Sequence, residues 1–344
     1  MKPWRWLLLP LWAAAILTSR KGFGRNPILG SERLNRRGLH VWRMATAHRM
    51  ADWRRRRLAH RVTPGDAAAF ARDGFVARGE FLPAAEFQAV AAEIAALTAP
   101  AHEMQEGGAV TRRIALTPAV LKALPATRAM LSAPDWRGLL AYVASFDVEP
   151  MVYVQTILAG AAGEDPDPQT ALHVDTFHPT MKAWFFLHDV AEASGPLTYV
   201  PGSHRLTKRR LAWEKRRSVL ASRKGARKGG AFRIGADDLT RLHLPPPHRF
   251  AVAGNTLVVA DTAGMHARGR SEGPSVRIEI YAHSRRNPFV PLVGLDPWSL
   301  PGLRGRKVPL YFWLHDRLAP LGVMREAWRR AGRLAPGAPF AKRS

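Results

Sequence analysis

The segment AWFFLHDVAEASGPLTYVPGSHR (residues 183–205) decides the fold class. Its two runs of β-branched and aromatic residues are separated by glycine, proline and small polar residues, a pattern typical of short strands joined by turns. Similar strand-like runs occupy residues 150–158, 256–260 and 276–282. Short strands without helices between them predict an antiparallel sandwich or jelly roll and argue against a doubly wound parallel sheet.

Helix signals precede these strands. Thr63 followed by proline predicts a helix start, Gly74 predicts its end, and a short strand is expected near residues 75–77. A longer amphipathic helix is expected from about Ala84, and helical spacing returns from about Val308. We therefore predict a mainly β core with flanking helices.

The chain has 344 residues, of which 47% are hydrophobic and 23% are charged. This balance is that of a globular chain with a sizeable core. The absence of cysteine excludes disulfide scaffolds, zinc fingers, thiol nucleophiles and cysteine-ligated iron–sulfur clusters. Any metal ion must therefore bind to histidine or carboxylate side chains.

Positive charge is concentrated in two regions of a chain whose net charge is +25. Residues 1–61 hold fifteen Lys or Arg against two acids, and residues 205–228 hold eleven against one. Such clusters point to nucleic acid, anionic lipid or a phosphate-bearing substrate. Because no RNP, KH or helix-turn-helix pattern is present, we do not expect nucleic acid.

The amino-terminal segment offers two membrane signals, each with an alternative. The apolar run at residues 6–18 is shorter than the roughly 20 residues that cross a bilayer, so it predicts an interfacial anchor, a signal sequence or a buried segment. Apolar residues recur at helical spacing over residues 39–53, with Arg43, Arg49 and residues 54–57 on the opposite side. This pattern predicts either a membrane-surface helix or a helix packed on the domain with a solvated basic face.

These features divide the chain into three parts. We expect a basic, apolar and amphipathic segment at 1–62, a domain at 63–307 with a basic insertion at 205–230, and a basic amphipathic tail at 308–344. The insertion is expected either to bind phosphate or an anionic lipid headgroup, or to be a solvated loop. The expected location is cytoplasmic, peripheral on the inner face of a membrane.

Three residues form a candidate metal site. His173 and Asp175 are two positions apart, so on a strand they share a face, and His266 follows a strand-like run ninety-three residues later. Two histidines and one carboxylate on one face of an ion are the facial triad of non-haem Fe(II) oxygenases.

Arg277 is a second candidate site residue, in the strand-like run SVRIEIY (275–281). A buried guanidinium needs a partner, because the burial of an unpaired charge is costly. The partner is either the distal carboxylate of 2-oxoglutarate or, in a purely structural role, Glu279 or Asp261.

The motifs together resemble the phytanoyl-CoA dioxygenase family of Fe(II)/2-oxoglutarate oxygenases. The resemblance rests on HVD (173–175), the segment 183–205, His266, and Arg277 eleven residues later, and FARDGFVARGEF (70–81) resembles the opening of the family domain. It implies a double-stranded β-helix, a cupin-like jelly roll, with N-terminal helices packed on it.

The resemblance also implies roles for individual residues. His173, Asp175 and His266 would hold Fe(II), and Arg277 would bind the C5 carboxylate of the co-substrate 2-oxoglutarate. O2 is the other co-substrate, and ascorbate is an additional candidate. The expected reaction is hydroxylation of an unactivated C–H bond, because the ligand Asp175 is retained.

Other pocket positions match the family less completely. Trp184 corresponds to a tryptophan that lines the cofactor pocket, and Gln155 either faces the iron and 2-oxoglutarate or lies on the outer sheet face. Many family members have serine where this chain has Arg268, and a second basic contact to 2-oxoglutarate could come from Arg112 or Arg113.

The sequence leaves two functions open. The first is a dioxygenase that acts on a small-molecule, acyl-CoA or lipid-like substrate. The alternative is a non-catalytic protein that binds a membrane or a polyanion on a degenerate oxygenase fold. The complete ligand set favours the enzyme.

Overall fold

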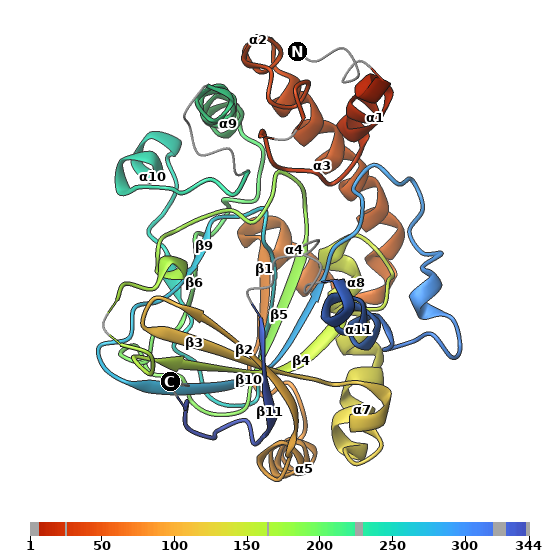
Figure 1. The fold of residues 1–344 in the computed structure, drawn as a ribbon, viewed down its shortest axis with the longest axis vertical. Coiled ribbons are helices and arrows are strands. Elements are labelled where there is room, and N and C mark those ends of the chain that lie inside the picture. The colour runs from red at the N-terminus through yellow and green to blue at the C-terminus, as the bar shows by residue number, and fades with distance from the viewer. Residues whose placement is uncertain (1–6, 25, 164, 224–229, 319–327, 342–344) are drawn as a thin grey trace.

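The computed structural model describes residues 7–24, 26–163, 165–223, 230–318 and 328–341, and it contains two antiparallel sheets (Figure 1). The order of the eight strands in the large sheet is β1 (Phe75–Arg78), β8 (Thr256–Asp261), β5 (Met181–Phe186), β10 (Ser275–Ser284), β4 (Met151–Ala159), β3 (Ala109–Ala115), β2 (Ala99–Glu106) and β11 (Arg329–Leu334). The small sheet has the order β7 (His248–Arg249), β6 (Leu197–Tyr199) and β9 (His266–Arg268).

Alternate residues of the central strands pack on opposite faces of the large sheet. On β5, Trp184 and Phe186 join the cluster that contains Leu197 and Tyr199 of the small sheet. Their neighbour Phe185 points the other way, into a cluster shared with the helices. The two sheets therefore enclose one core between them, which confirms the predicted jelly roll.

Helices cover the outer face of the large sheet and one end of the molecule (Figure 1). Those on the outer face are α4 (Pro64–Asp73), α5 (Ala84–Ala95), α6 (Pro118–Leu121), α7 (Pro125–Ser132) and α8 (Pro134–Ala144). Those grouped at the end are α1 (Leu9–Ala14), α2 (Glu32–Arg36), α3 (Leu39–Leu58), α9 (Lys208–Ser222) and α10 (Ala236–Leu242). The remaining helix is α11 (Lys307–Leu318), and short 3₁₀ turns lie at Ala15–Leu17, Ala59–Arg61, Pro168–Thr170 and Pro297–Ser299.

The helix start predicted at Thr63 and its end predicted at Gly74 are confirmed. Thr63 caps α4 in a capping box with Asp66, and Gly74 ends the helix in the left-handed region with φ +86°. A side chain at Gly74 would collide with His204 and with the Tyr199 hydroxyl, so the turn into β1 requires glycine.

Helix α3 corrects one expectation. The arginines Arg43, Arg54 and Arg55, expected on a solvated face, are buried, whereas Trp42 of the expected apolar face is 49% exposed. Arg54 donates hydrogen bonds to the main-chain oxygens of Ser145 (3.0 Å), Pro288 (3.1 Å) and Val290 (2.9 Å). A guanidinium has five N–H donors, and main-chain carbonyls satisfy them inside the protein.

Arg43 binds the amino-terminal segment in the same way. It donates to the main-chain oxygens of Ile16 (2.8 Å), Thr18 (2.8 Å) and Arg20 (2.9 Å). Its guanidinium also lies 4.2 Å from the centre of the Phe177 ring. The segment after α1 is thus held against the domain.

The apolar run at residues 6–18 divides its side chains between the interior and the surface. Trp12 and Ala15 are buried, whereas Leu7 and Leu11 are exposed, and Trp6 lies outside the described residues. No helix in the described ranges is long and apolar enough to span a bilayer.

The two remaining basic regions also form regular structure. In the insertion, α9 buries Arg210, which pairs with Glu214 at 2.9 Å and donates to the main-chain oxygen of Ser203 at 2.6 Å. Residues 224–229 of the insertion lie outside the described residues. Beyond α11, β11 pairs with β2 and extends the large sheet at its edge.

Arg43→Met is expected to lower the stability of the protein by about 2–4 kcal/mol, because three main-chain carbonyls lose their donors. Urea denaturation measures the loss, and limited proteolysis should show faster cleavage near residues 15–24. Arg49→Met on the same helix is the control, because the Arg49 side chain is exposed. Equal stability of the two variants would contradict the assignment of Arg43.

Two buried histidines make the stability depend on pH. Burial lowers the pKa of both His178 and His204 to about 3. The unfolded chain binds these protons below about pH 6.5 and the folded chain does not, so stability falls as the pH drops from about 6.5 towards 3. His178→Gln should reduce the slope by about 1.4 kcal/mol per pH unit between about pH 5.5 and 4.5. Urea titrations measure the slope; His188→Gln, at an exposed position, should leave it unchanged.

Candidate metal centre and cofactor pocket

Main-chain pairing brings the predicted triad together. His173 N–H donates to His266 O and His266 N–H donates to His173 O, both at 2.9 Å. Asp175 N–H donates to Thr262 O at 3.0 Å, next to the turn that precedes β9. Only His173 of the HVD motif forms a strand-like bridge, and Asp175 lies in the bend after it.

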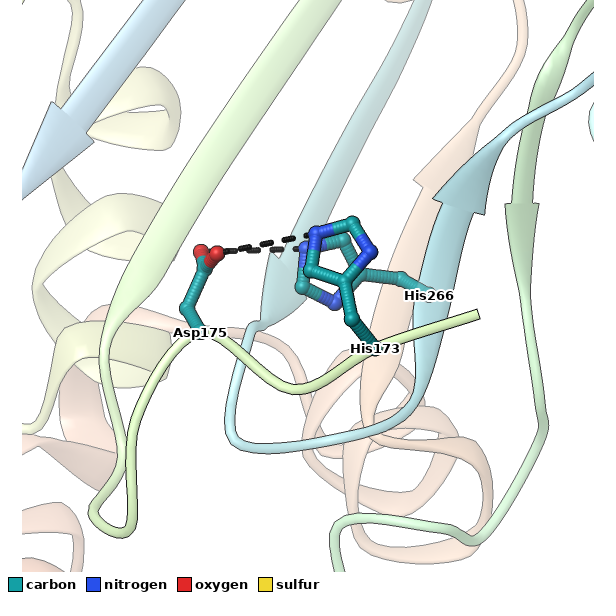
Figure 2. A group of neighbouring side chains, drawn as sticks. All are labelled: His173, Asp175 and His266. Carbon is teal, nitrogen blue, oxygen red and sulfur yellow. Dashed lines mark ion pairs between the residues drawn. The ribbon is translucent and has the colours of Figure 1, made fainter. Parts of the chain in front are cut away.

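The three side chains face one another at short distances. The ligand atoms of His173, Asp175 and His266 all lie within 4.8 Å of one another. Figure 2 shows the carboxylate on one side and the two imidazoles on the other, with Nε2 of each ring towards Asp175, at 3.8 Å for His173 and 3.7 Å for His266. This is the arrangement of a facial metal site.

Hydrogen bonds determine the tautomer of both imidazoles. His173 Nδ1 lies 2.9 Å from Ala171 O, and His266 Nδ1 lies 3.0 Å from Gly264 O. Because a carbonyl only accepts, each Nδ1 carries the proton and each Nε2 presents a lone pair. His266 Nε2 is buried and finds no hydrogen-bond partner among the described residues. A bound metal ion would satisfy it.

The charge states also suit a cation. Burial lowers the pKa of the His266 imidazole to about 3 and also lowers that of His173, so both rings are neutral at pH 7. Burial alone raises the pKa of Asp175, but the charge of Lys182 and its hydrogen bond outweigh this effect and hold the pKa below its usual range. The site therefore offers two neutral nitrogen ligands and one carboxylate.

The predicted pocket residues lie around a cavity of about 220 Å³ beside the triad. Its lining includes all six predicted site residues: His173, Asp175, His266, Arg277, Trp184 and Gln155. Gln155 thus faces the cavity and not the outer side of the sheet. Arg268 also lines the cavity and pairs with Asp167 at 2.7 Å.

Arg277 belongs to a hydrogen-bonded chain across three strands. Its Nε donates to Glu279 Oε2 at 3.0 Å and its Nη1 donates to Gly195 O. Gln155 Nε2 donates to Glu279 Oε1 at 2.7 Å, and Arg113 Nε donates to Gln155 Oε1 at 2.8 Å. Arg277 therefore has the structural partner Glu279 and also borders the cavity, so both expected partners are compatible with its place.

Of the two candidates for a second basic contact, the structure places only Arg113 at the cavity. Arg112 is buried elsewhere: it pairs with Glu103 at 2.6 Å and donates to main-chain oxygens of the C-terminal segment, Pro336 at 3.1 Å among them. Sequence reasoning missed Lys182, which lines the cavity and pairs with Asp175 at 2.7 Å. The sequence contains a signal for Lys182: in the strand MKAWFF (181–186), alternate residues share a face, so Lys182 lies on the same face as the predicted pocket residue Trp184.

A jelly roll with two histidines and one carboxylate beside a buried arginine defines the class of non-haem iron, 2-oxoglutarate-dependent oxygenases. Residues 70–225 match the family model described as Phytanoyl-CoA dioxygenase (PhyH). This match agrees with the resemblance that the motifs predict for that part of the chain.

Solved structures to which this chain is similar include three that contain iron. The epimerase SnoN, in complex with Fe³⁺, alpha ketoglutarate and nogalamycin RO, is 20% identical, with 69% of this chain and 90% of that chain covered and a TM-score of 0.42. EctD from S. alaskensis with bound Fe is 17% identical (69% and 83% covered, TM-score 0.40), and HygX from Streptomyces hygroscopicus with iron bound is 14% identical (64% and 86%, TM-score 0.39). No curated protein matches the sequence closely.

The purified protein is expected to bind one Mn²⁺ or Fe²⁺ ion per chain, and His266→Ala should weaken the affinity at least about 100-fold, because one of three ligands is lost. Anaerobic titration calorimetry measures both values. His188→Ala is the matched control, since His188 is exposed. Unchanged affinity in His266→Ala would show that the ion binds elsewhere.

Proposed function

We propose that the protein is an Fe(II)/2-oxoglutarate-dependent dioxygenase that hydroxylates an unactivated C–H bond of a small-molecule, acyl or lipid-like substrate. The observation that carries the proposal is the triad: two neutral imidazoles with lone pairs at Nε2 and one ionised carboxylate, next to a cavity bordered by Arg277.

In this proposal His173, Asp175 and His266 would hold the iron through two imidazole nitrogens and one carboxylate. Bound there, Fe(II) with 2-oxoglutarate and O2 supplies the oxidising power for hydroxylation, and 2-oxoglutarate is decarboxylated to succinate. The main-chain acceptors Ala171 O and Gly264 O keep both rings in the ligand tautomer.

Arg277 orients the co-substrate. Its bonds to Glu279 and Gly195 use Nε and Nη1, and no hydrogen bond from Nη2 occurs in the part of the chain that the structure describes. A carboxylate of 2-oxoglutarate can accept from Nη2, while Glu279 holds the guanidinium in place. The cavity of about 220 Å³ has room for a small dicarboxylate.

The neighbouring residues keep this side of the pocket rigid. Arg113 and Gln155 continue the hydrogen-bonded chain to Glu279, and Trp184 closes the inner side with a buried ring. Because the other donors and acceptors of this network are already paired, it needs little rearrangement when the co-substrate binds to Arg277 Nη2. The completeness of the triad supports this catalytic proposal over a non-catalytic binding protein on the same fold.

Anaerobic addition of Fe(II) and 2-oxoglutarate is expected to produce the weak visible charge-transfer band of their complex, and addition of O2 should yield succinate. His173→Ala and Asp175→Ala should each abolish succinate formation, because a ligand is lost. Absorption spectroscopy and succinate assays measure the two effects, and near-normal turnover in either variant would refute the site.

Removal of Arg277 tests the co-substrate contact separately. The double variant Arg277→Gln/Glu279→Gln removes both charges of the buried pair, so no unpaired carboxylate remains. Its affinity for 2-oxoglutarate should fall at least about tenfold, since a charge-assisted hydrogen bond is lost, while metal affinity stays. Arg249→Ala, an exposed position, is the control, and equal 2-oxoglutarate affinity in both variants would contradict the role of Arg277.

A further inference from the structure

A second cavity, of about 450 Å³, lies where β3 ends at Ala115 and β4 begins at Met151. Helices α6, α7 and α8 and the start of α11 supply most of the rest of its lining (Figure 1). It shares no lining residue with the cavity beside the triad, which Arg113 and Gln155 of the same two strands border. The second cavity is therefore a separate candidate site.

Most of the side chains that line the second cavity are apolar. Trp136 and Val308 are buried, at 1% and 6% exposed. Leu121 and Leu131 are only partly buried and remain in contact with water. Transfer of such apolar surface out of water is favourable, and cavities of roughly 300–1,000 Å³ with mainly apolar walls and a few polar groups are typical of small-molecule sites. The walls thus favour a ligand with an apolar part.

The same lining holds five cations and one carboxylate. The carboxylate, Glu149, is shared by two of the cations: Oε2 lies 3.3 Å from Arg137 Nη2 and 3.2 Å from Arg304 Nε. Within the described ranges, no ion pair or side-chain hydrogen bond is formed by the other three cations, which are Lys122, Arg128 and Lys307. Positive charge at this cavity is therefore in excess.

The three unpaired cations come from three different elements. Lys122 directly follows α6, Arg128 lies on α7, and Lys307 is the first residue of α11. The fold brings all three to one cavity, although they are spread over 186 positions of the chain. A carboxylate bound there would accept charge-assisted hydrogen bonds from guanidinium or ammonium groups.

We propose that the second cavity binds an alkyl carboxylate, with the alkyl chain against Trp136 and Leu131 and the carboxylate at Arg128 and Lys307. The proposal goes beyond the proposed function, because neither the metal ion nor 2-oxoglutarate takes part in it. A compact anion such as inorganic phosphate would leave the apolar walls hydrated, and an uncharged alkyl chain would leave the cations unpaired. An alkyl carboxylate satisfies both features of the lining.

Titration calorimetry with hexanoate, octanoate and decanoate, each below its micelle-forming concentration, tests the apolar part of the site. Burial of each added CH₂ group strengthens binding about threefold to fourfold, so decanoate should bind at least about tenfold more tightly than hexanoate. Decan-1-ol, which has the same chain length and no charge, should bind more weakly than decanoate. Saturation of the protein with Mn²⁺ and 2-oxoglutarate should leave the affinity for decanoate unchanged.

The double variant Arg128→Met/Lys307→Met tests the charged part. Its affinity for decanoate should fall at least about tenfold, because two charge-assisted contacts are lost while methionine keeps the apolar surface. Arg209→Met is the matched control, since Arg209 is an exposed arginine on α9 and lies outside the cavity lining. Thermal denaturation without ligand shows whether both variants are folded as the unchanged protein is.

Four results would overturn the inference. Equal affinities for hexanoate and decanoate would show that the apolar walls take no part, and equal affinities for decanoate and decan-1-ol would show the same for the cations. Normal binding of decanoate to the folded double variant would place the ligand elsewhere. Displacement of decanoate by 2-oxoglutarate would place it in the cavity beside the triad.

Discussion

Two main-chain hydrogen bonds between His173 and His266 are the interaction on which the site depends. They join segments ninety-three residues apart and set the two imidazoles 4.6 Å from each other, centre to centre. Both Nε2 atoms then lie towards Asp175, and both Nδ1 atoms towards main-chain carbonyls. The metal-binding tautomer thus follows from backbone pairing inside a jelly roll, because the same chain geometry that forms the bridge supplies the acceptors.

Much of the positive charge of this chain is used inside the molecule. Arg43, Arg54, Arg112 and Arg210 are buried, and each donates to main-chain carbonyls of distant segments. Burial of a guanidinium is costly unless its donors are paired, so these contacts hold the segments that provide the oxygens. The amino-terminal segment, the loop before α9 and the C-terminal segment are all attached to the domain in this way.

Cations outnumber carboxylates in the lining of the candidate pocket, which includes Arg113, Lys182, Arg268 and Arg277. Next to Arg277, the amide of Gln155 and the carboxylate of Glu279 link the two cations Arg113 and Arg277, so the hydrogen-bonding groups are largely paired. At the triad, Lys182 pairs with Asp175 at 2.7 Å.

The sequence by itself predicted several of the central strands, the helix that begins after Thr63 and six residues that border the cavity, because alternation, capping and motif spacing are local properties. It did not predict β2, β3 or β11. The tertiary structure alone decided which charges are buried. Hydropathy predicts that Arg43 and Arg54 are exposed to solvent, but both are buried. Main-chain carbonyls of residues 16–20 accept the hydrogen bonds of Arg43. Those of Ser145, Pro288 and Val290 accept the hydrogen bonds of Arg54. The hydrogen bond from Lys21 to Asp175 likewise cannot be predicted from the sequence, because the two residues are 154 positions apart. Burial of a charge depends on partners that only the folded chain brings within reach.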